Sequence, residues 1–146
     1  MKSMPTMVMR QLIPFVPALL ILSACDVSGG PDWHLRRGVI TNFEDSLSLQ
    51  VPDTIRSGQP ATLRVWTHGD RCVLPAYTDQ HLTATLLTVE PYDSILVGDV
   101  NCPSAPCLCS HDVTVLFAQP GCVTLRVVGL GNDSAMVTRE RTLVIH

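Results

Sequence analysis

The richest group of chemically versatile side chains lies within ten residues, which hold Cys102, Cys107, Cys109 and His111. Thiolate sulfur and imidazole nitrogen are ligands that suit Zn²⁺ or Cu(I), so one hypothesis is a metal-binding or thiol-redox protein that uses these four residues. The spacing differs from the paired C-x₂-C of zinc ribbons, and redox-active pairs are usually C-x-x-C rather than C-x-C. The pattern therefore favours disulfides over a metal site.

The cysteines that follow the amino-terminal segment are Cys72, Cys102, Cys107, Cys109 and Cys122. In an oxidising compartment the thiols of small exported domains form disulfides. We expect Cys72 to pair with Cys102, which closes a loop of about 30 residues and contributes about 3–4 kcal/mol in the chain-entropy model. Cys109 is the competing partner of Cys72, and a second pair would join Cys122 to Cys107 or Cys109. Because five is odd, at least one thiol stays free or pairs between chains.

Motifs of known catalytic chemistry are missing from the sequence. It has no His-x-x-x-His pair, no Gly-x-Ser-x-Gly elbow and no glycine loop that cradles phosphate. Acidic residues are spread singly over the chain, so paired-carboxylate chemistry has no focus. We therefore expect a protein that is not an enzyme and that needs no cofactor. A hydrolase on a β-sandwich is a third hypothesis, which a cleft with converging polar groups would support.

The amino-terminal segment has the layout of a secretory signal. Lys2 and Arg10 precede eleven apolar residues, 12–22 (LIPFVPALLIL), and small residues follow them. Eleven residues of helix rise only about 16 Å, whereas a bilayer core needs about 20 apolar residues. We therefore expect residues 1–24 to be a cleaved signal peptide rather than a permanent membrane span.

The end of this segment, Leu22-Ser23-Ala24-Cys25, resembles the lipobox of bacterial lipoproteins. The resemblance implies that Cys25 becomes the first mature residue, is acylated, and anchors an exported protein to a bacterial membrane. More than one acyl chain makes such an anchor stable, because each buried methylene contributes about 0.8 kcal/mol. Asp26 resembles the enterobacterial signal for retention in the inner membrane. That rule varies between bacterial groups, so both the periplasmic face of the inner membrane and the outer membrane stay open.

The mature chain divides into a tether and one domain. Residues 25–43 begin with the lipidated cysteine and a turn-rich linker, and apolar residues from Trp33 onward could dock on the domain or supply an edge strand. Residues 44–146 form the domain. Leu47, Leu49 and Val51 alternate with polar residues, which is typical of a half-buried strand.

The same period of two recurs in residues 61–67, 113–117, 123–127 and 136–145, with turn residues between them. Residues 83–89 and 94–100 are predicted to form two further strands separated by a turn. Residues 68–80 and 101–112 are predicted to be loops. Short alternating strands at roughly ten-residue spacing predict an all-β fold, a small antiparallel β-sandwich of about seven strands.

Two segments add a family resemblance. Residues 57–65 (SGQPATLRV) resemble the start of many bacterial immunoglobulin-like domains, and residues 117–127 (FAQPGCVTLRV) resemble their penultimate strand. Those domains usually have Tyr where Val123 stands, so a tyrosine corner is missing. The resemblance implies an immunoglobulin-like sandwich, and it implies no activity.

The expected partners follow from the charge and from one strand face. Removal of residues 1–24 takes away Lys2 and Arg10 and no acid, which leaves 8 basic against 13 acidic residues and a net charge of −5. We therefore expect no nucleic-acid partner, because such proteins show a basic face. Arg64 and Trp66 fall on the face opposite Leu63 and could contact an envelope protein or a polysaccharide. The alternatives are that Trp66 belongs to the core or that residues 33–43 cover it.

Overall fold

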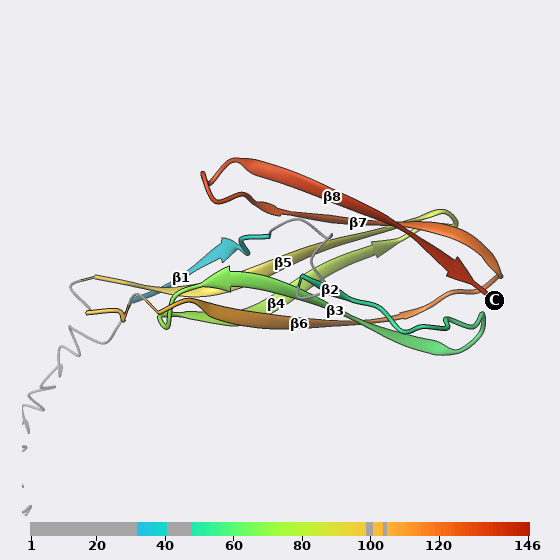
Figure 1. The fold of residues 1–146 in the computed structure, drawn as a ribbon, viewed down its shortest axis with the longest axis horizontal. Helices are drawn as coiled ribbons and strands as arrows, with labels where there is room; N and C mark the ends of the chain where they lie inside the picture. Colours follow the sequence, from blue (N-terminus) through green and yellow to red (C-terminus); the bar gives the residue numbers. More distant parts are fainter. Residues whose placement is uncertain (1–31, 41–47, 99–100, 104) are drawn as a thin grey trace, which may run out of the picture.

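The computed structural model describes residues 32–40, 48–98, 101–103 and 105–146. The predicted signal peptide, Cys25, the start of the tether and Leu47 lie outside the described residues. The eight strands are β1 (Asp32–Arg37), β2 (Leu49–Gln50), β3 (Pro60–Gly69), β4 (Val73–Leu82), β5 (Leu86–Val97), β6 (Cys107–Leu116), β7 (Gly121–Leu130) and β8 (Met136–Ile145) (Figure 1). Within the described ranges, no helix is long and apolar enough to cross a membrane.

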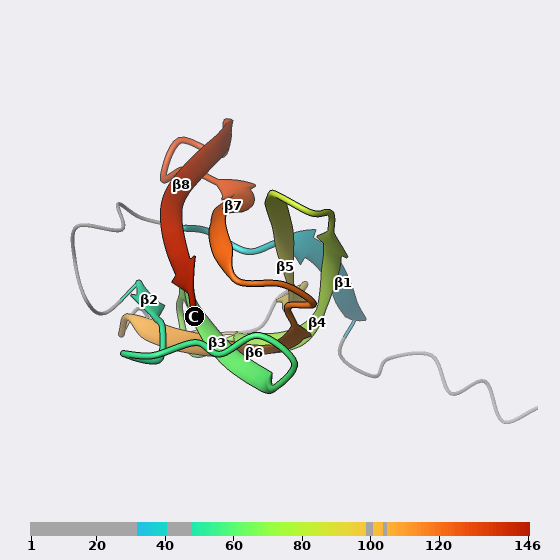
Figure 2. The same cartoon turned by 90° about the vertical axis from the view of Figure 1, so that its right-hand side faces the viewer.

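The strands form two facing sheets, which Figure 2 shows end-on. One sheet contains β2, β3 and β6, and the other is built around β5. Strand β4 pairs along one edge of β5, while the other edge pairs first with β7 and then with β1. Strand β8 completes this sheet beside β7. The predicted all-β sandwich is confirmed, with eight strands rather than about seven.

One ladder departs from the expected antiparallel pattern. Strands β5 and β7 run parallel over four residue pairs, from Leu86 opposite Thr124 to Val89 opposite Val127. The other ladders between the described strands are antiparallel. Parallel pairing needs a crossover connection, and here the chain returns to β5 after passing through β6 in the opposite sheet.

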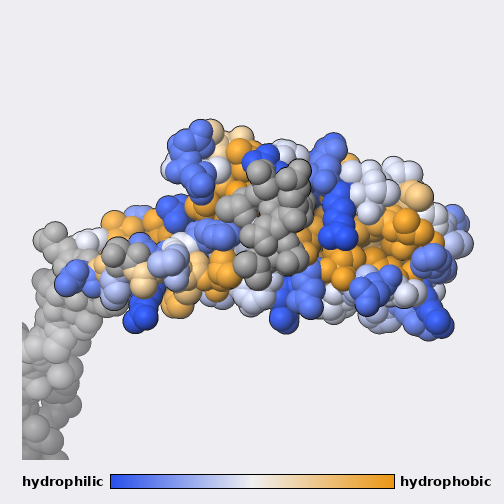
Figure 3. All heavy atoms as spheres, in the orientation of Figure 1, coloured by the Kyte–Doolittle hydropathy of each residue, from blue (hydrophilic) through white to orange (hydrophobic). Residues whose placement is uncertain are grey.

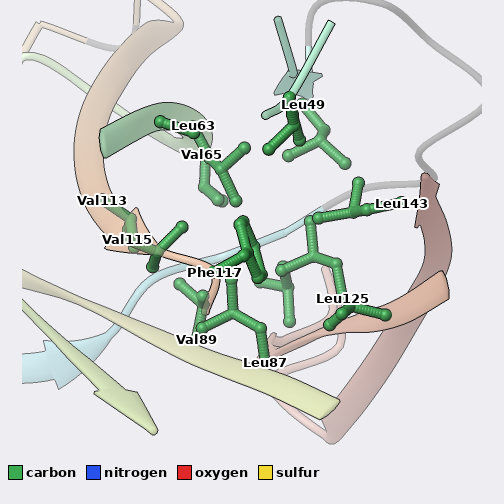
Figure 4. Packing of buried hydrophobic residues seen from close by; sticks show 14 of the residues in the cluster. Leu49, Leu63, Val65, Leu87, Val89, Val113, Val115, Phe117, Leu125 and Leu143 are labelled. Atoms are coloured by element: carbon green, nitrogen blue, oxygen red, sulfur yellow. The ribbon is translucent and has the colours of Figure 1, made fainter. Parts of the chain in front are cut away.

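The core lies between the sheets and is made by the alternating residues of the strands. Leu63 and Val65 of β3 face Leu125 and Val127 of β7, and all four side chains are fully buried. Figure 4 shows Leu63, Val65 and Leu125, with neighbouring apolar side chains such as Phe117, pointing into the space between the sheets. Burying one such side chain contributes about 1.5–3 kcal/mol, so the alternation read in the sequence is the main source of stability.

The segment after β1, residues 38–40, is hydrogen-bonded to both sheets. The N–H of Ile40 donates to the carbonyl of Leu130 in β7 at 2.8 Å. The N–H of His68 in β3 donates to the carbonyl of Val39, also at 2.8 Å. This segment therefore connects the two sheets directly after β1 ends.

Gly38 within this segment is required by packing. A Cβ atom at this position would overlap Cγ2 of Thr67 and would lie 3.0 Å from Oδ2 of Asp93. Since a close-packed interior has no room for such an overlap, any larger residue would displace the chain or Thr67. Gly38 thus allows the segment to pass directly over these two buried side chains.

The sandwich is less completely closed where β8 ends. Ile55 and Ile145 form a single parallel bridge there. A cleft of about 310 Å³ lies between residues 51–55 and the end of β8. Figure 3 shows apolar residues gathered on this part of the molecule, interrupted by polar ones. Val144, which is more than half exposed, belongs to this part of the chain.

Three expectations about local structure are wrong. Most of residues 68–80 were expected to be a loop, but β4 begins at Val73. The expected turn between residues 89 and 94 does not exist, since β5 runs through it without a break. The cysteine-rich loop ends earlier than expected, because β6 already begins at Cys107. In contrast, β1 supplies the edge strand that was one of the two options for the tether.

Candidate functional site

A polar cluster lies inside the sandwich, between the two sheets. Nε2 of His111 on β6 lies 2.9 Å from Oδ1 of Asp93 on β5. The hydroxyl of Thr67 on β3 donates to the same carboxylate oxygen at 3.0 Å. On the other side of the ring, Nδ1 of His111 lies 3.2 Å from the hydroxyl oxygen of Thr78 on β4. The cluster therefore joins four strands and both sheets.

This arrangement has the residue types of acid–base chemistry but no access for a substrate. The side chains of His111 and Asp93 are 2% and 0% exposed. Both ring nitrogens of His111 already have partners, so neither is free to exchange a proton with a bound molecule. The second carboxylate oxygen of Asp93 is buried without a hydrogen-bond partner. We interpret the cluster as a structural connection between the sheets.

Cys109 lies beside this cluster, and its thiol has low reactivity. Its thiol is buried and donates to the carbonyl of Val73 at 3.4 Å. Burial, together with the negative charge of nearby Asp93, raises the pKa of the Cys109 thiol to about 11. Since the thiolate is the reactive form, Cys109 is a poor nucleophile and a poor metal ligand at neutral pH.

The disulfide expected between Cys72 and Cys102 is present, with the two Cα atoms 5.7 Å apart. It joins the start of β4 to the segment before β6. The carboxylate of Asp70 accepts a hydrogen bond from the N–H of Cys72 at 2.8 Å, and one of its oxygens lies within 4.8 Å of both sulfur atoms. Because these two sulfurs are bonded to each other, neither is available as a thiolate ligand.

The expected second disulfide is not formed. Cys107, Cys109 and Cys122 are all free thiols. Strand β6 begins with Cys107, whereas Cys122 is the second residue of β7, at the far end of the sandwich. The run from Cys109 to the end of β6 spans roughly 23 Å at strand geometry, which is too far for a disulfide.

The four residues of the metal hypothesis are not brought together as a ligand set. Cys102 forms the disulfide with Cys72, and His111 is hydrogen-bonded through both ring nitrogens. Cys107 and Cys109 share one face of β6, but the Cys109 thiol is buried and protonated. In the described part of the chain, potential ligand atoms gather instead at Asp70, Cys72 and Cys102, where the disulfide removes both thiolates.

Arg64 and Trp66 lie on the outer face of the β2–β3–β6 sheet, as expected, so Trp66 is not a core residue. Arg64 binds Asp112 through two hydrogen bonds, at 2.5 and 2.9 Å, and its guanidinium lies 5.7 Å from the centre of the Trp66 ring. The hydrogen bonds from Arg64 also lower the pKa of Asp112. A cleft of about 230 Å³ lined by Gln50, Thr62, Arg64 and Asp112 adjoins this cluster. We call this surface the Arg64 face.

The outer face of the other sheet carries a second surface that the sequence analysis missed. On three neighbouring strands, the side chains that share this face are Trp33, Leu35 and Arg37 of β1, Tyr92, Ser94 and Leu96 of β5, and Leu74 and Tyr77 of β4. The rings of Tyr77 and Tyr92 stack at 4.7 Å between centroids. We call this surface the Trp33 face. Its strands could not be aligned from the sequence, because β4 was expected to be a loop.

The Trp33 face carries one ion pair, between Arg37 and Glu90, and beside it Asp79 of β4 is exposed to solvent. Arg37 binds the carboxylate of Glu90 at 2.6 Å and the hydroxyl of Tyr92 at 3.1 Å, and it lies over the Tyr92 ring. The hydrogen bond to Tyr92 and the charge of Glu90 raise the pKa of Arg37 above its usual value. The apolar side chains beside it are exposed: Trp33 41%, Leu35 60%, Leu74 51% and Tyr77 45%.

The fold and the sites thus define a β-sandwich with a sealed polar cluster and two chemically different outer faces. In comparisons with known proteins, no family model, no curated protein and no solved structure matches this chain. The resemblances to bacterial lipoproteins and to immunoglobulin-like domains therefore rest on the short sequence motifs alone.

Proposed function

We propose that this protein is an exported bacterial lipoprotein, held to a membrane by acylated Cys25, whose sandwich acts as a non-catalytic binding or structural module of the envelope. The lipobox and the preceding apolar segment support the anchor. The disulfide between Cys72 and Cys102 suits an oxidising compartment.

The observation that carries the non-catalytic role is the sealing of the His111–Asp93 pair. Groups of this kind serve catalysis when a cleft brings substrate to them. Here the side chains of His111 and Asp93 are enclosed by both sheets. The two outer faces carry aromatic rings and ion pairs instead. Such outer surfaces are suited to recognition rather than to bond making.

The Arg64 face is the surface that we assign to an envelope partner, either a protein or a polysaccharide. Arg64 and Asp112 hold each other in place, so their free hydrogen-bonding positions are pre-organised. The neighbouring Trp66 ring offers a flat apolar surface beside them. A sugar ring or an aromatic side chain would fit both features.

The anchor is tested by the variant Cys25→Ser in the full chain. The unchanged protein should incorporate labelled palmitate and fractionate with membranes, and the variant should do neither. The double variant Cys72→Ser/Cys102→Ser serves as a control, because it lacks the disulfide but should still incorporate the label. If Cys25→Ser matures and fractionates as the parent does, the proposed anchor is wrong.

The partner surface is tested by Trp66→Ala in the same acylated protein. Binding to isolated cell-wall polysaccharide and chemical cross-linking to envelope proteins in cells should both be compared with the parent. We expect at least one of them to fall about tenfold, which corresponds to the loss of one aromatic contact of about 1.4 kcal/mol. Val144→Ala is the control, because Val144 is exposed on β8 and belongs to neither outer face that we name. An unchanged result in both assays would reject the Arg64 face.

A further inference from the structure

We propose that the Trp33 face rests on the lipid headgroup layer of the membrane that holds Cys25. This inference depends on the proposed anchor and adds to it a second, reversible contact made by the folded domain. It assigns the two outer faces of the sandwich to opposite tasks, with the Trp33 face toward the bilayer and the Arg64 face away from it.

The first argument is the position of the face relative to the anchor. Only seven residues separate Cys25 from Trp33 in the sequence. A fully extended chain covers about 3.3–3.6 Å per residue, so Trp33 can lie at most about 28 Å from the acylated residue. Strand β1 begins at Asp32. Its exposed side chains, Trp33 and Leu35, are thus the first part of the folded domain that the tether holds near the membrane surface.

The second argument is the arrangement of the apolar side chains. Residues paired across β1, β5 and β4 form rows on this face. Leu35 and Leu74 both pair with Ser94, and Arg37 and Tyr77 both pair with Tyr92. The exposed apolar groups therefore gather on one face of three neighbouring strands, with Ser94 and Arg37 among them. Exposed apolar side chains gathered on one face in this way mark an interaction site.

The third argument is the chemical character of the face. Trp and Tyr prefer the interface between membrane and water, where an apolar ring and a polar tip are both satisfied. The charges at the centre of the face, Arg37 and Glu90, neutralise each other at 2.6 Å. This ion pair therefore adds no net charge to the part of the face that meets the headgroups.

Because of the tether, even a weak affinity of the Trp33 face for the headgroups is sufficient for contact. Because only a short linker joins the face to the anchor, the effective concentration of the face at the surface is in the millimolar range. A contact that would be undetectable for the free domain is then occupied for much of the time. The acyl chains hold the protein at the membrane, and the face adds a weaker, reversible contact that orients the domain.

The two tryptophans provide an internal experiment. Acylated full-length protein is reconstituted in phosphatidylcholine vesicles whose acyl chains carry bromine near the headgroup, a quencher of indole fluorescence. Trp66→Phe leaves Trp33 as the reporter, and Trp33→Phe leaves Trp66. We expect about a twofold or greater loss of Trp33 emission, since interfacial tryptophan lies at headgroup depth, and no loss of Trp66 emission.

A second pair of variants tests the surface itself. Leu35→Glu/Leu74→Glu should abolish the quenching of Trp33 without changing the flotation of the protein with vesicles. Leu116→Glu is the matched control, because Leu116 is 56% exposed but lies on β6 in the opposite sheet. Circular dichroism of each variant checks that the sandwich is intact.

The outcomes separate the two proposals. If the protein floats with vesicles but Trp33 is quenched no more than Trp66, the docking inference is wrong and the anchor stands. If the parent does not float, or if Cys25→Ser floats equally well, the anchor is wrong and the docking inference is rejected with it.

Discussion

His111 on β6 and Asp93 on β5 face each other across the two sheets, with Nε2 and Oδ1 2.9 Å apart. Together with the bonds of Thr67 to Asp93 and of Thr78 to His111, the pair connects the two layers inside their apolar core. Removing one partner of such a buried pair leaves the other without compensation, and the cost exceeds that of losing an ordinary hydrogen bond.

His111→Leu should therefore lower the free energy of unfolding by about 3–5 kcal/mol, because the buried Asp93 carboxylate loses its histidine partner and keeps only the hydrogen bond from Thr67. Urea unfolding followed by circular dichroism measures this change. His81→Leu is the control, since His81 is exposed on β4, and it should stay within about 0.5 kcal/mol of the parent. Equal stability of the two variants would show that the pair does not hold the sheets together.

Gly38→Ala should destabilise the protein by about 1–3 kcal/mol or more, because the added Cβ would overlap Cγ2 of Thr67. Thr67→Ser removes that methyl group and keeps the hydroxyl that binds Asp93. The double variant should thus be less destabilised than the sum of the two single ones. Thermal unfolding of all four proteins measures the coupling, and simple additivity would contradict the close contact.

Replacing the disulfide by serines, Cys72→Ser/Cys102→Ser, should cost about 3–4 kcal/mol, because the bond closes a loop of about 30 residues in the unfolded chain. The measurement is urea unfolding without reductant. Cys122→Ser is the control, since Cys122 is an exposed free thiol. If dithiothreitol destabilises the double variant as much as the parent, another disulfide exists in solution.

The free thiols should react in a fixed order with iodoacetamide at pH 8. Cys122 is exposed and reacts first, Cys107 follows, and Cys109 reacts last because its pKa is raised to about 11. With a pKa near 11 rather than 9, the thiolate fraction is about 100-fold smaller, before steric protection is counted. Peptide mass spectrometry over time gives the three rates, and labelling in urea should make them similar.

The raised pKa of Cys109 predicts that its labelling rate and the folding stability depend on pH. The labelling rate of Cys109 should rise about tenfold per pH unit up to its pKa, as the thiolate fraction does. Since the pKa is higher in the folded state, folding stability is complete below the unfolded-state pKa of about 9 and falls as the pH rises toward 11. A labelling rate of Cys109 that is flat between pH 8 and 10 would contradict the buried, protonated thiol.

The alternating strands could be predicted because each has one buried and one exposed face. Strand β3 is an example, in which Leu63 and Val65 are buried while Arg64 and Trp66 face outward. The pairing of Cys72 with Cys102 could be proposed from the compartment and the spacing, and it is confirmed. These features depend on local pattern and on general chemistry, which the sequence contains directly.

Strand β4 could not be predicted, since nearly all of its residues are exposed and no alternation exists. It is a strand because β5 pairs with it, with an irregularity between Pro75 and Tyr77. Asp93 is the other example, because an aspartate shortly after a proline is typical of turns. Its place in the core depends on His111, Thr67 and Gly38, which lie on three other segments. Local propensity is overridden wherever a distant partner compensates for a buried polar group.

The connection made by residues 38–40 also determines how the molecule would resist a mechanical load. A chain fastened at its amino-terminal end receives force through β1, whose six residue pairs with β5 lie along the direction of the strand. A pull along that direction loads those pairs together instead of opening them one after another. Behind them, the hydrogen bonds of Val39 and Ile40 to His68 and Leu130 pass the force to both sheets. The strand that follows the tether is thus also the part of the fold best placed to bear tension.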